Sequence, residues 1–151
     1  MNKTISWCLI IAITIIVVIL SFKAPWVLSD QNIFLKNFVN HEILNFLGVI
    51  VAITIGSIAN LHLELNKLEE QIKKEVFTGT RSSLKRSIYC LIGTLVITII
   101  LAVIKPLIVK TSLDLMVSSF VNGFALIVVF VNILTLIDIL QATFKVKPNY
   151  D

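Results

Sequence analysis

Charged residues are scarce in this sequence, at 15% of 151 residues, whereas soluble domains carry about 25%. The chain also lacks a recognisable nucleophile–base pair, a phosphate-binding loop and a pair of carboxylates that could share a proton. The sequence therefore has none of the residue combinations that active sites commonly use, because each class of catalysis needs such groups at a suitable spacing. We therefore predict that the protein is not an enzyme.

Histidine and cysteine are equally rare, with two residues of each. His41 and His62 would stand about 31 Å apart on one continuous helix, which is too far to ligate one metal ion. Cys8 and Cys90 fall near ends of apolar runs that we assign below to the cytoplasm, where a disulfide is not expected. The sequence therefore predicts neither a metal site nor a cofactor.

Four long apolar runs dominate what the sequence does contain, at residues 5–22, 43–63, 88–109 and 115–140. Each run is long enough to cross the ~30 Å hydrocarbon core of a bilayer as an α-helix. No small-residue cleavage site follows the first run, so we expect it to remain as a membrane helix. The predicted fold is all-α, with one four-helix transmembrane domain over residues 1–151 and no separate soluble domain.

Basic residues are distributed unequally between the two predicted sides of the membrane. Nine lysines and arginines fall at the termini and in segment 64–87, and four fall in the other two loops. The positive-inside rule then places both termini and segment 64–87 in the cytoplasm. Trp7 and Tyr89 fall at one interface and Trp26 at the other, as expected for aromatic anchors. We expect both termini on the cytoplasmic side of the membrane, with the lipid bilayer as the first partner of the protein.

The segment between the first two runs has a helical pattern of its own. Pro25 should end the first helix, and Ser29 or Asp30 could cap a helix over residues 31–40. This helix could lie on the outer membrane surface, or it could extend the second membrane helix.

The second run contains two small-xxx-small repeats in register, formed by Gly48, Ala52 and Gly56. Small residues at this spacing let two helices approach closely within lipid. At about 100° per residue, the stripe continues to the polar residues His41 and Asn45. We expect this stripe to pack helices together and to favour a homo-oligomer.

Residues 64–87 predict a cytoplasmic helical hairpin. Apolar residues continue from the second run at coiled-coil spacing, namely Leu61, Leu65, Leu68, Ile72 and Val76. The triplet 78–80 should end this helix, and Thr80 or Ser82 should cap the next one. The apolar seam could dock a cytoplasmic protein.

The same hairpin carries six basic residues, which are Lys67 and the five candidates for an anion site, Lys73, Lys74, Arg81, Lys85 and Arg86. An anionic ligand such as a nucleotide or oligonucleotide would fit this charge, and so would anionic lipid headgroups. We favour headgroups, because four glutamates share the hairpin and reduce its net charge to +2.

The fourth run places Ser118, Asn122 and Asn132 on one face, to within about a quarter turn. In an oligomer these side chains would line a hydrated pore. The alternative is that they hydrogen-bond neighbouring helices, as polar side chains in membrane helices often do. Asp138 is the acid that lies well inside an apolar run, either as a functional group or as an interfacial acid that reaches water.

The repeat Gly48, Ala52 and Gly56, followed by the charged run 61–86 in a small four-span chain, resembles bacterial membrane effectors of anti-phage defence. The layout is similar to that of lambda-type exclusion channel proteins and Hailong-type channel subunits. The resemblance implies an oligomeric channel or membrane-permeabilising effector of the bacterial inner membrane that responds to a cytoplasmic anionic ligand or partner. The alternative is a poreless membrane anchor or sensor subunit that docks a cytoplasmic partner through the extended second helix.

Overall fold

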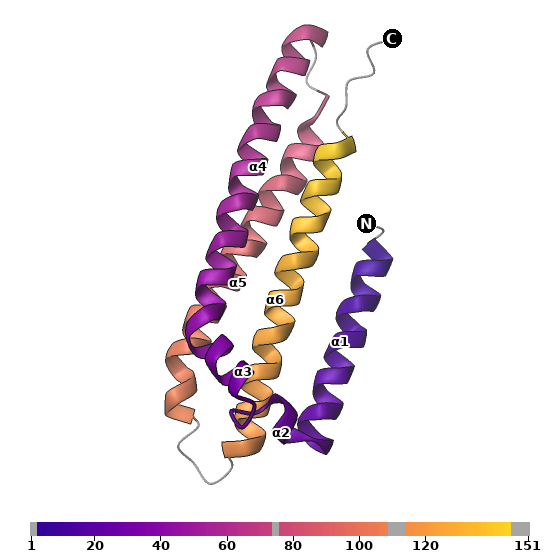
Figure 1. Cartoon of the computed structure of the whole chain (residues 1–151). Helices are drawn as coiled ribbons and strands as arrows, with labels where there is room; N and C mark the ends of the chain where they lie inside the picture. The colour runs from indigo at the N-terminus through magenta and orange to yellow at the C-terminus, as the bar shows by residue number, and fades with distance from the viewer. Residues whose placement is uncertain (1–2, 74–75, 109–113, 146–151) are drawn as a thin grey trace.

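The computed structural model describes residues 3–73, 76–108 and 114–145, and all regular structure in these ranges is helical (Figure 1). The elements are α1 (Lys3–Lys23), α2 (Pro25–Leu28), α3 (Ile33–Asn37), the π-helical turn η1 (Phe38–Glu42), α4 (Ile43–Ile72), α5 (Thr78–Ile108) and α6 (Asp114–Lys145). The predicted all-α fold is confirmed.

Four helical stretches among the described residues are long and apolar enough to cross a membrane, namely Thr4–Lys23, Ile33–Ile72, Thr78–Leu107 and Leu115–Gln141. They overlap the four predicted runs. Large apolar side chains such as Ile15, Ile100 and Leu107 are exposed on the outside of the bundle. Such a surface suits a hydrocarbon environment, because helices satisfy their backbone hydrogen bonds internally.

The segment after α1 folds differently from the predicted capping. α1 ends before Pro25, as expected, and Pro25 begins α2. The cap of α3 is Asn32, whose side chain accepts a hydrogen bond from the Leu35 N–H at 3.3 Å, so the prediction of Ser29 or Asp30 was wrong. The hydroxyl of Ser29 instead accepts from the Gln31 N–H, and the Asp30 carboxylate turns toward α5 and α6.

A continuous helical path runs from α3 through η1 into α4. Of the two alternatives for this segment, the structure therefore shows the extension of the second long helix. Five residues of this path form the π-helical turn, 38–42, in which each turn holds more residues than in an α-helix.

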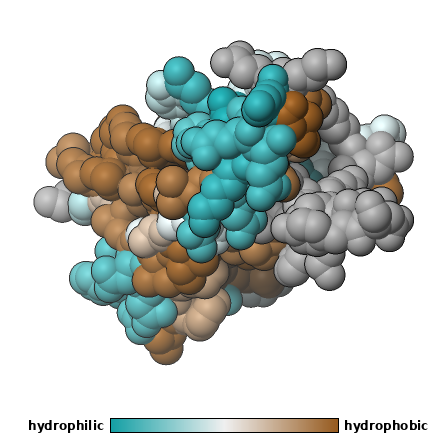
Figure 2. All heavy atoms as spheres, turned by 90° about the horizontal axis from the view of Figure 1, so that it is seen from above, coloured by the Kyte–Doolittle hydropathy of each residue, from teal (hydrophilic) through white to brown (hydrophobic). Residues whose placement is uncertain are grey.

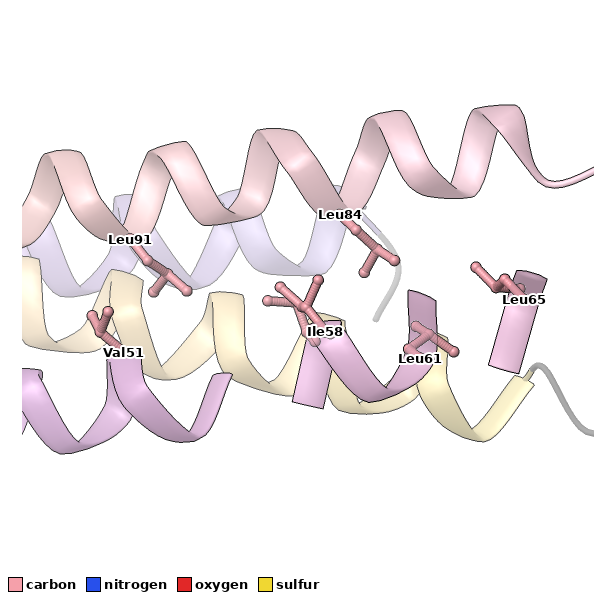
Figure 3. Packing of buried hydrophobic residues seen from close by; sticks show 7 residues of the cluster. Val51, Ile58, Leu61, Leu65, Leu84 and Leu91 are labelled. Atoms are coloured by element: carbon pink, nitrogen blue, oxygen red, sulfur yellow. The ribbon is translucent and has the colours of Figure 1, made fainter. Parts of the chain in front are cut away.

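α6 lies at the centre of the bundle and packs against α1, α2, α4 and α5 (Figure 1). One hydrophobic cluster joins α4 to α5 and α6 (Figure 3), with Val51, Ile58, Leu61, Leu65, Leu84, Leu91 and Ile139 as its buried members. A second cluster joins η1 and α4 to α6, through residues such as Val39 and Val128. A third gathers Val17 of α1 with Leu28 and Leu35. α6 is thus the helix against which α1, α2, α4 and α5 all pack, while α4 and α5 also pack directly against each other.

α4 and α5 form a helical hairpin that extends past the N-terminal end of α1 (Figure 1). α4 ends at Ile72, where Lys73 takes a left-handed conformation with φ of 53°. α5 begins at Thr78, so the predicted helix end at 78–80 and the predicted cap at Thr80 or Ser82 were wrong. Figure 2 looks down on this end and shows hydrophilic side chains gathered there, with hydrophobic side chains beside them.

Candidate functional site

The three residues predicted to line a pore, Ser118, Asn122 and Asn132, lie on the central helix α6 and are buried inside the protomer. Each makes hydrogen bonds within the chain. This arrangement is the one expected when polar side chains join neighbouring helices. A pore-lining role would need a conformation in which α6 exchanges these partners for water.

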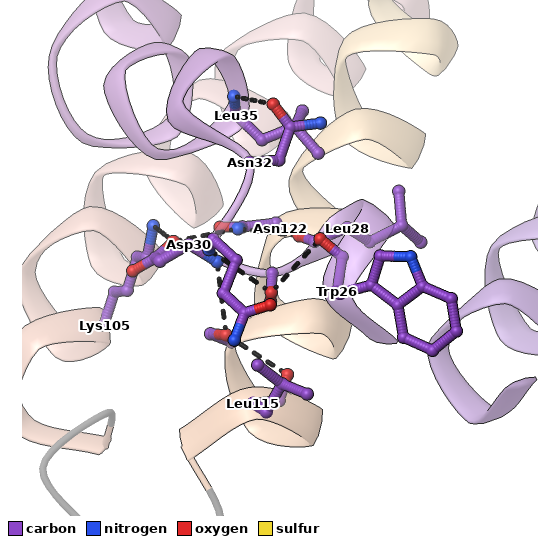
Figure 4. Close-up of polar contacts among 11 residues, drawn as sticks. Trp26, Leu28, Asp30, Asn32, Leu35, Lys105, Leu115 and Asn122 are labelled. Atoms are coloured by element: carbon purple, nitrogen blue, oxygen red, sulfur yellow. Dashed lines mark hydrogen bonds and ion pairs between the residues drawn. The ribbon is translucent and has the colours of Figure 1, made fainter. Parts of the chain in front are cut away.

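Asp30, between α2 and α3, brings α5 and α6 together at one end of the bundle (Figure 4). Its Oδ1 atom lies 2.8 Å from Lys105 Nζ on α5 and accepts a hydrogen bond from Asn122 Nδ2 on α6 at 3.0 Å. Asn122 Nδ2 also donates to the Leu28 carbonyl at 2.8 Å. The Asp30 N–H donates to Ser118 Oγ at 3.5 Å. We call Asp30, Lys105, Ser118 and Asn122 the Asp30 cluster.

The two charges of the Asp30 cluster are unequally buried. The Lys105 side chain is 2% exposed, and the Asp30 side chain is 24% exposed. Their 2.8 Å approach makes an ion pair, yet Lys105 Nζ has no hydrogen bond of acceptable geometry among the described residues, and neither has Asn122 Oδ1. Burying an unpaired charge costs free energy, so the buried ammonium group of Lys105 depends on the negative charge of Asp30.

A second polar contact joins α5 to α6 midway along α6. The Thr94 hydroxyl donates to Asn132 Oδ1 at 3.0 Å, and Asn132 Nδ2 donates to the Val128 carbonyl at 2.8 Å. Thr98, one turn further along α5, is buried and donates to the Thr94 carbonyl at 2.8 Å. Asn132 therefore acts as a bridge between helices in this conformation.

A close approach of α1 to α6 was not anticipated from the sequence. A Cβ atom on Gly123 would stand 2.5 Å from Val17 Cγ1. One turn away, Ser119 Oγ donates to Ser21 Oγ at 3.1 Å, and both serines are buried. Ser119 and Gly123 form a small-xxx-small pair, so the signal that could have found this contact is the one recognised in the second run.

The predicted packing residues Gly48, Ala52 and Gly56 form an outward face of α4. A Cβ atom on Gly48 or Gly56 would meet no atom within 4 Å, and Ala52 and Gly56 are exposed. Buried residues of α4 such as Leu47 and Ile58 fall on the opposite side at about 100° per residue. We call Gly48, Ala52 and Gly56 the small stripe; it lies outside the packing of the protomer.

Among the basic residues of the hairpin, Arg81 is already engaged. It donates to Asn66 Oδ1 at 2.6 Å and forms an ion pair with Glu69. Glu69 Oε1 also accepts from the N–H groups of Val76 and Phe77, at 3.1 and 2.9 Å. The Glu69 carboxylate therefore connects the end of α4 to the turn and to the start of α5. Arg81, on α5, stabilises this arrangement through its ion pair with Glu69.

Three of the other hairpin residues predicted to bind an anion lie on the surface. Lys73, Lys85 and Arg86 are exposed, and Lys74 lies outside the described residues. The apolar seam is divided, because Leu61 and Leu65 are buried against α5 and α6 while the residues nearer the tip, Ile72 and Val76, are exposed.

No protein-family model, curated protein or solved structure matches this chain. Within the part of the chain that the structure describes, no group of three or more His, Cys, Asp or Glu side chains is placed to hold a metal ion. The function has to be inferred from three features of the molecule, which are the buried polar contacts of α6, the outward small stripe and the charged hairpin.

Proposed function

We propose that the protein is an oligomeric channel, or membrane-permeabilising effector, of the bacterial inner membrane, and that its copies assemble through α4. The observation that carries this proposal is the small stripe, Gly48, Ala52 and Gly56, which faces outward on a helix long enough to span a membrane. In lipid, small residues at this spacing favour association, because they let two backbones approach closely.

Exposed amides beside the small stripe support a second copy as its partner. Asn45 and Asn60 are both exposed on α4. An amide that faces hydrocarbon loses the hydrogen bonds that water would give it. Packing α4 against α4 of another copy would bring such amides together while the small stripe allows close backbone contact. Lipid at this face would neither form hydrogen bonds with the amides nor provide close contact between backbones.

Conduction needs a polar path through a molecule whose outer surface is apolar. α6 supplies candidate groups for this path in Ser118, Asn122 and Asn132, which are closed off by intrachain hydrogen bonds. In the proposed conducting state, α6 separates from α5 and from the α2–α3 connection, so that water replaces these partners. The conformation described above would then be the closed one.

The hairpin is the proposed receiver of a cytoplasmic signal in anti-phage defence, an assignment supported by the layout of the chain. Lys73, Lys85 and Arg86 offer exposed charge to an anionic ligand, or to lipid headgroups. Arg81 would contribute only after releasing Glu69. α5 runs without interruption from the hairpin to Ile108, so a displacement at its start would be carried toward the Asp30 cluster.

Replacing Gly56 with leucine tests the assembly. The added side chain would hold two copies of α4 apart, so we expect native mass spectrometry to show smaller species and induced cells to depolarise less. A weakening of about tenfold, equal to ~1.4 kcal/mol of association free energy, would suffice to be seen. Val103→Leu, at an exposed position on α5, is the matched control and should change neither result. Unchanged oligomer size and leak in Gly56→Leu would overturn this interface.

A poreless anchor or sensor subunit is the second candidate function. Its support is the pair Ile72 and Val76, which leave apolar surface exposed near the tip of the hairpin. A partner protein would have to dock there, because Leu61 and Leu65 are covered by the protomer itself. A wild type that stays monomeric, causes no depolarisation and crosslinks through its hairpin to a co-expressed neighbouring protein would favour this candidate over the channel.

A further inference from the structure

We propose that the Asp30 carboxylate locks the closed conformation by compensating the buried ammonium group of Lys105, and that loss of the Asp30 charge releases the ends of α5 and α6. The consequence for membrane leak rests on the proposed channel function. The lock itself concerns the burial of Lys105, and it can be tested without any channel activity.

The Asp30 cluster connects three parts of the chain that are far apart in the sequence. Asp30 belongs to the connection between α2 and α3, Lys105 to the end of α5, and Asn122 to α6 (Figure 4). Lys105 directly precedes Pro106, whose ring removes one helical hydrogen bond from this part of α5. The end of α5 is therefore held less firmly by its own backbone, so it can move when the ammonium group of Lys105 loses its counterion.

Lys105 and Asn122 meet the same oxygen atom of Asp30, at 2.8 Å and 3.0 Å. A change at the Asp30 carboxylate therefore removes the counterion of Lys105 and, at the same time, disturbs the hydrogen bond that keeps Asn122 turned inward. Because Asn122 is a proposed pore-lining residue and is completely buried, release of Lys105 and exposure of the polar face of α6 would occur together.

The dependence of the two charges on each other is unequal. Lys105 is almost completely buried, and the α6 residues of the cluster, Ser118 and Asn122, are neutral. Without the charge of Asp30, the ammonium group could be stabilised only by reaching water, which requires the end of α5 to move. Asp30 is partly exposed and keeps its hydrogen bond from Asn122, so it tolerates the loss of Lys105. The lock therefore opens when the acid is neutralised and stays shut when the base is removed.

The first test measures the accessibility of Lys105 in the full-length protein reconstituted in liposomes. A membrane-impermeant amine reagent and site-resolved mass spectrometry give its labelling rate, with exposed Lys23 and Lys36 as internal standards. We expect Lys105 to react at least about tenfold more slowly in the wild type, because protection reports the population of the open state. In Asp30→Asn its rate should approach that of Lys23. A wild-type Lys105 that reacts as fast as Lys23 would overturn the lock.

The second test compares leak of a small dye from the same liposomes. Asp30→Asn should leak without any added signal, whereas Lys105→Met and the double variant Asp30→Asn/Lys105→Met should stay as tight as the wild type. Equal leak from both single variants, or no rescue in the double variant, would contradict the lock. If Lys105 becomes exposed in Asp30→Asn but no dye leaks, the lock is supported and the proposed channel function is contradicted. If Asp30→Asn fails to insert, the labelling of wild-type Lys105 decides.

Discussion

The contact at Gly123 leaves no room for even a methyl group. An added Cβ would lie 2.5 Å from Val17 Cγ1 on α1, and valine cannot turn away easily because its branched side chain is stiff at χ1. Ser119 and Ser21 form their hydrogen bond one turn from this point. Gly123 therefore fixes how closely α1 can lie against the central helix.

Gly123→Ala should destabilise the protomer by about 1–3 kcal/mol, the usual cost of overpacking. We expect a lower unfolding temperature in mild detergent, with α1 displaced from α6. Gly93→Ala, on α5 and outside the small stripe, is the matched control, because its Cβ would meet no atom within 4 Å and alanine is the better helix former. Its stability should be unchanged or slightly higher. Equal stabilities for the two alanine variants would contradict the packing described at Gly123.

Small-residue spacing alone could not distinguish the small stripe from the contact at Gly123 in the sequence. Gly48 and Gly56 carry the same signal as Ser119 and Gly123, yet the first pair faces outward and the second meets α1. The spacing states that a helix can be approached closely. Which helix approaches depends on how the helices are arranged around α6, and a local pattern does not contain that information.

At the scale of the elements, the long helices were predictable and their ends were less so. The apolar runs are long enough to cross a bilayer and contain few charged residues, which identified them from composition. The end of α4 depends on Glu69, which accepts from the N–H groups of Val76 and Phe77 across the turn. Arg81 then fixes Glu69 from the next helix. These contacts span many residues, so capping signals around Thr80 misplaced the turn.

The π-helical turn has a similar effect on the predicted stripe of α4. Rotation of about 100° per residue places His41 in line with the small stripe only if the helix is α-helical throughout. The turn at 38–42 changes the phase. Residues from Asn45 onward keep the predicted outward position on α4. His41 lies within the π-helical turn, so regular α-helical spacing could not predict its direction relative to the small stripe.

Glu69→Ala should loosen the hairpin without disturbing the rest of the bundle. The substitution removes a cap and an ion pair, at a cost of about 1–2 kcal/mol. Hydrogen exchange measured by mass spectrometry should become faster over peptides that contain Val76 and Phe77, and stay unchanged over α6. Glu70→Ala provides the control, since Glu70 is exposed on the adjacent position. Identical exchange in the two variants would remove Glu69 from this role.

At the scale of the whole molecule, polar groups gather around α6 while the outer surface is apolar. The sequence placed Ser118, Asn122 and Asn132 on one face and left two roles open, pore lining and helix packing. Their partners come from three different segments, the α2–α3 connection, α5 and α6 itself. A periodic pattern identifies a polar face but not the chain that covers it, so only the fold could show that the protomer covers this one.

Orientation in the membrane decides which compartment each end of the molecule meets. The unequal distribution of lysine and arginine, nine against four, predicts the hairpin in the cytoplasm and the Asp30 cluster outside. In a Cys8→Ser/Cys90→Ser background, Gln31→Cys and Ser83→Cys place single thiols at exposed positions on the two ends. An impermeant maleimide should label Gln31→Cys in intact spheroplasts and Ser83→Cys only after lysis.

The opposite labelling would turn the hairpin outward. A cytoplasmic ligand could then no longer reach Lys73, Lys85 or Arg86, and the proposed signal would lose its site. The lock between Asp30 and Lys105 would be unaffected, because it depends on the burial of an ammonium group beside one carboxylate and not on the side of the membrane. The labelling experiment therefore tests whether a cytoplasmic ligand can reach the hairpin, and its result is independent of the lock between Asp30 and Lys105.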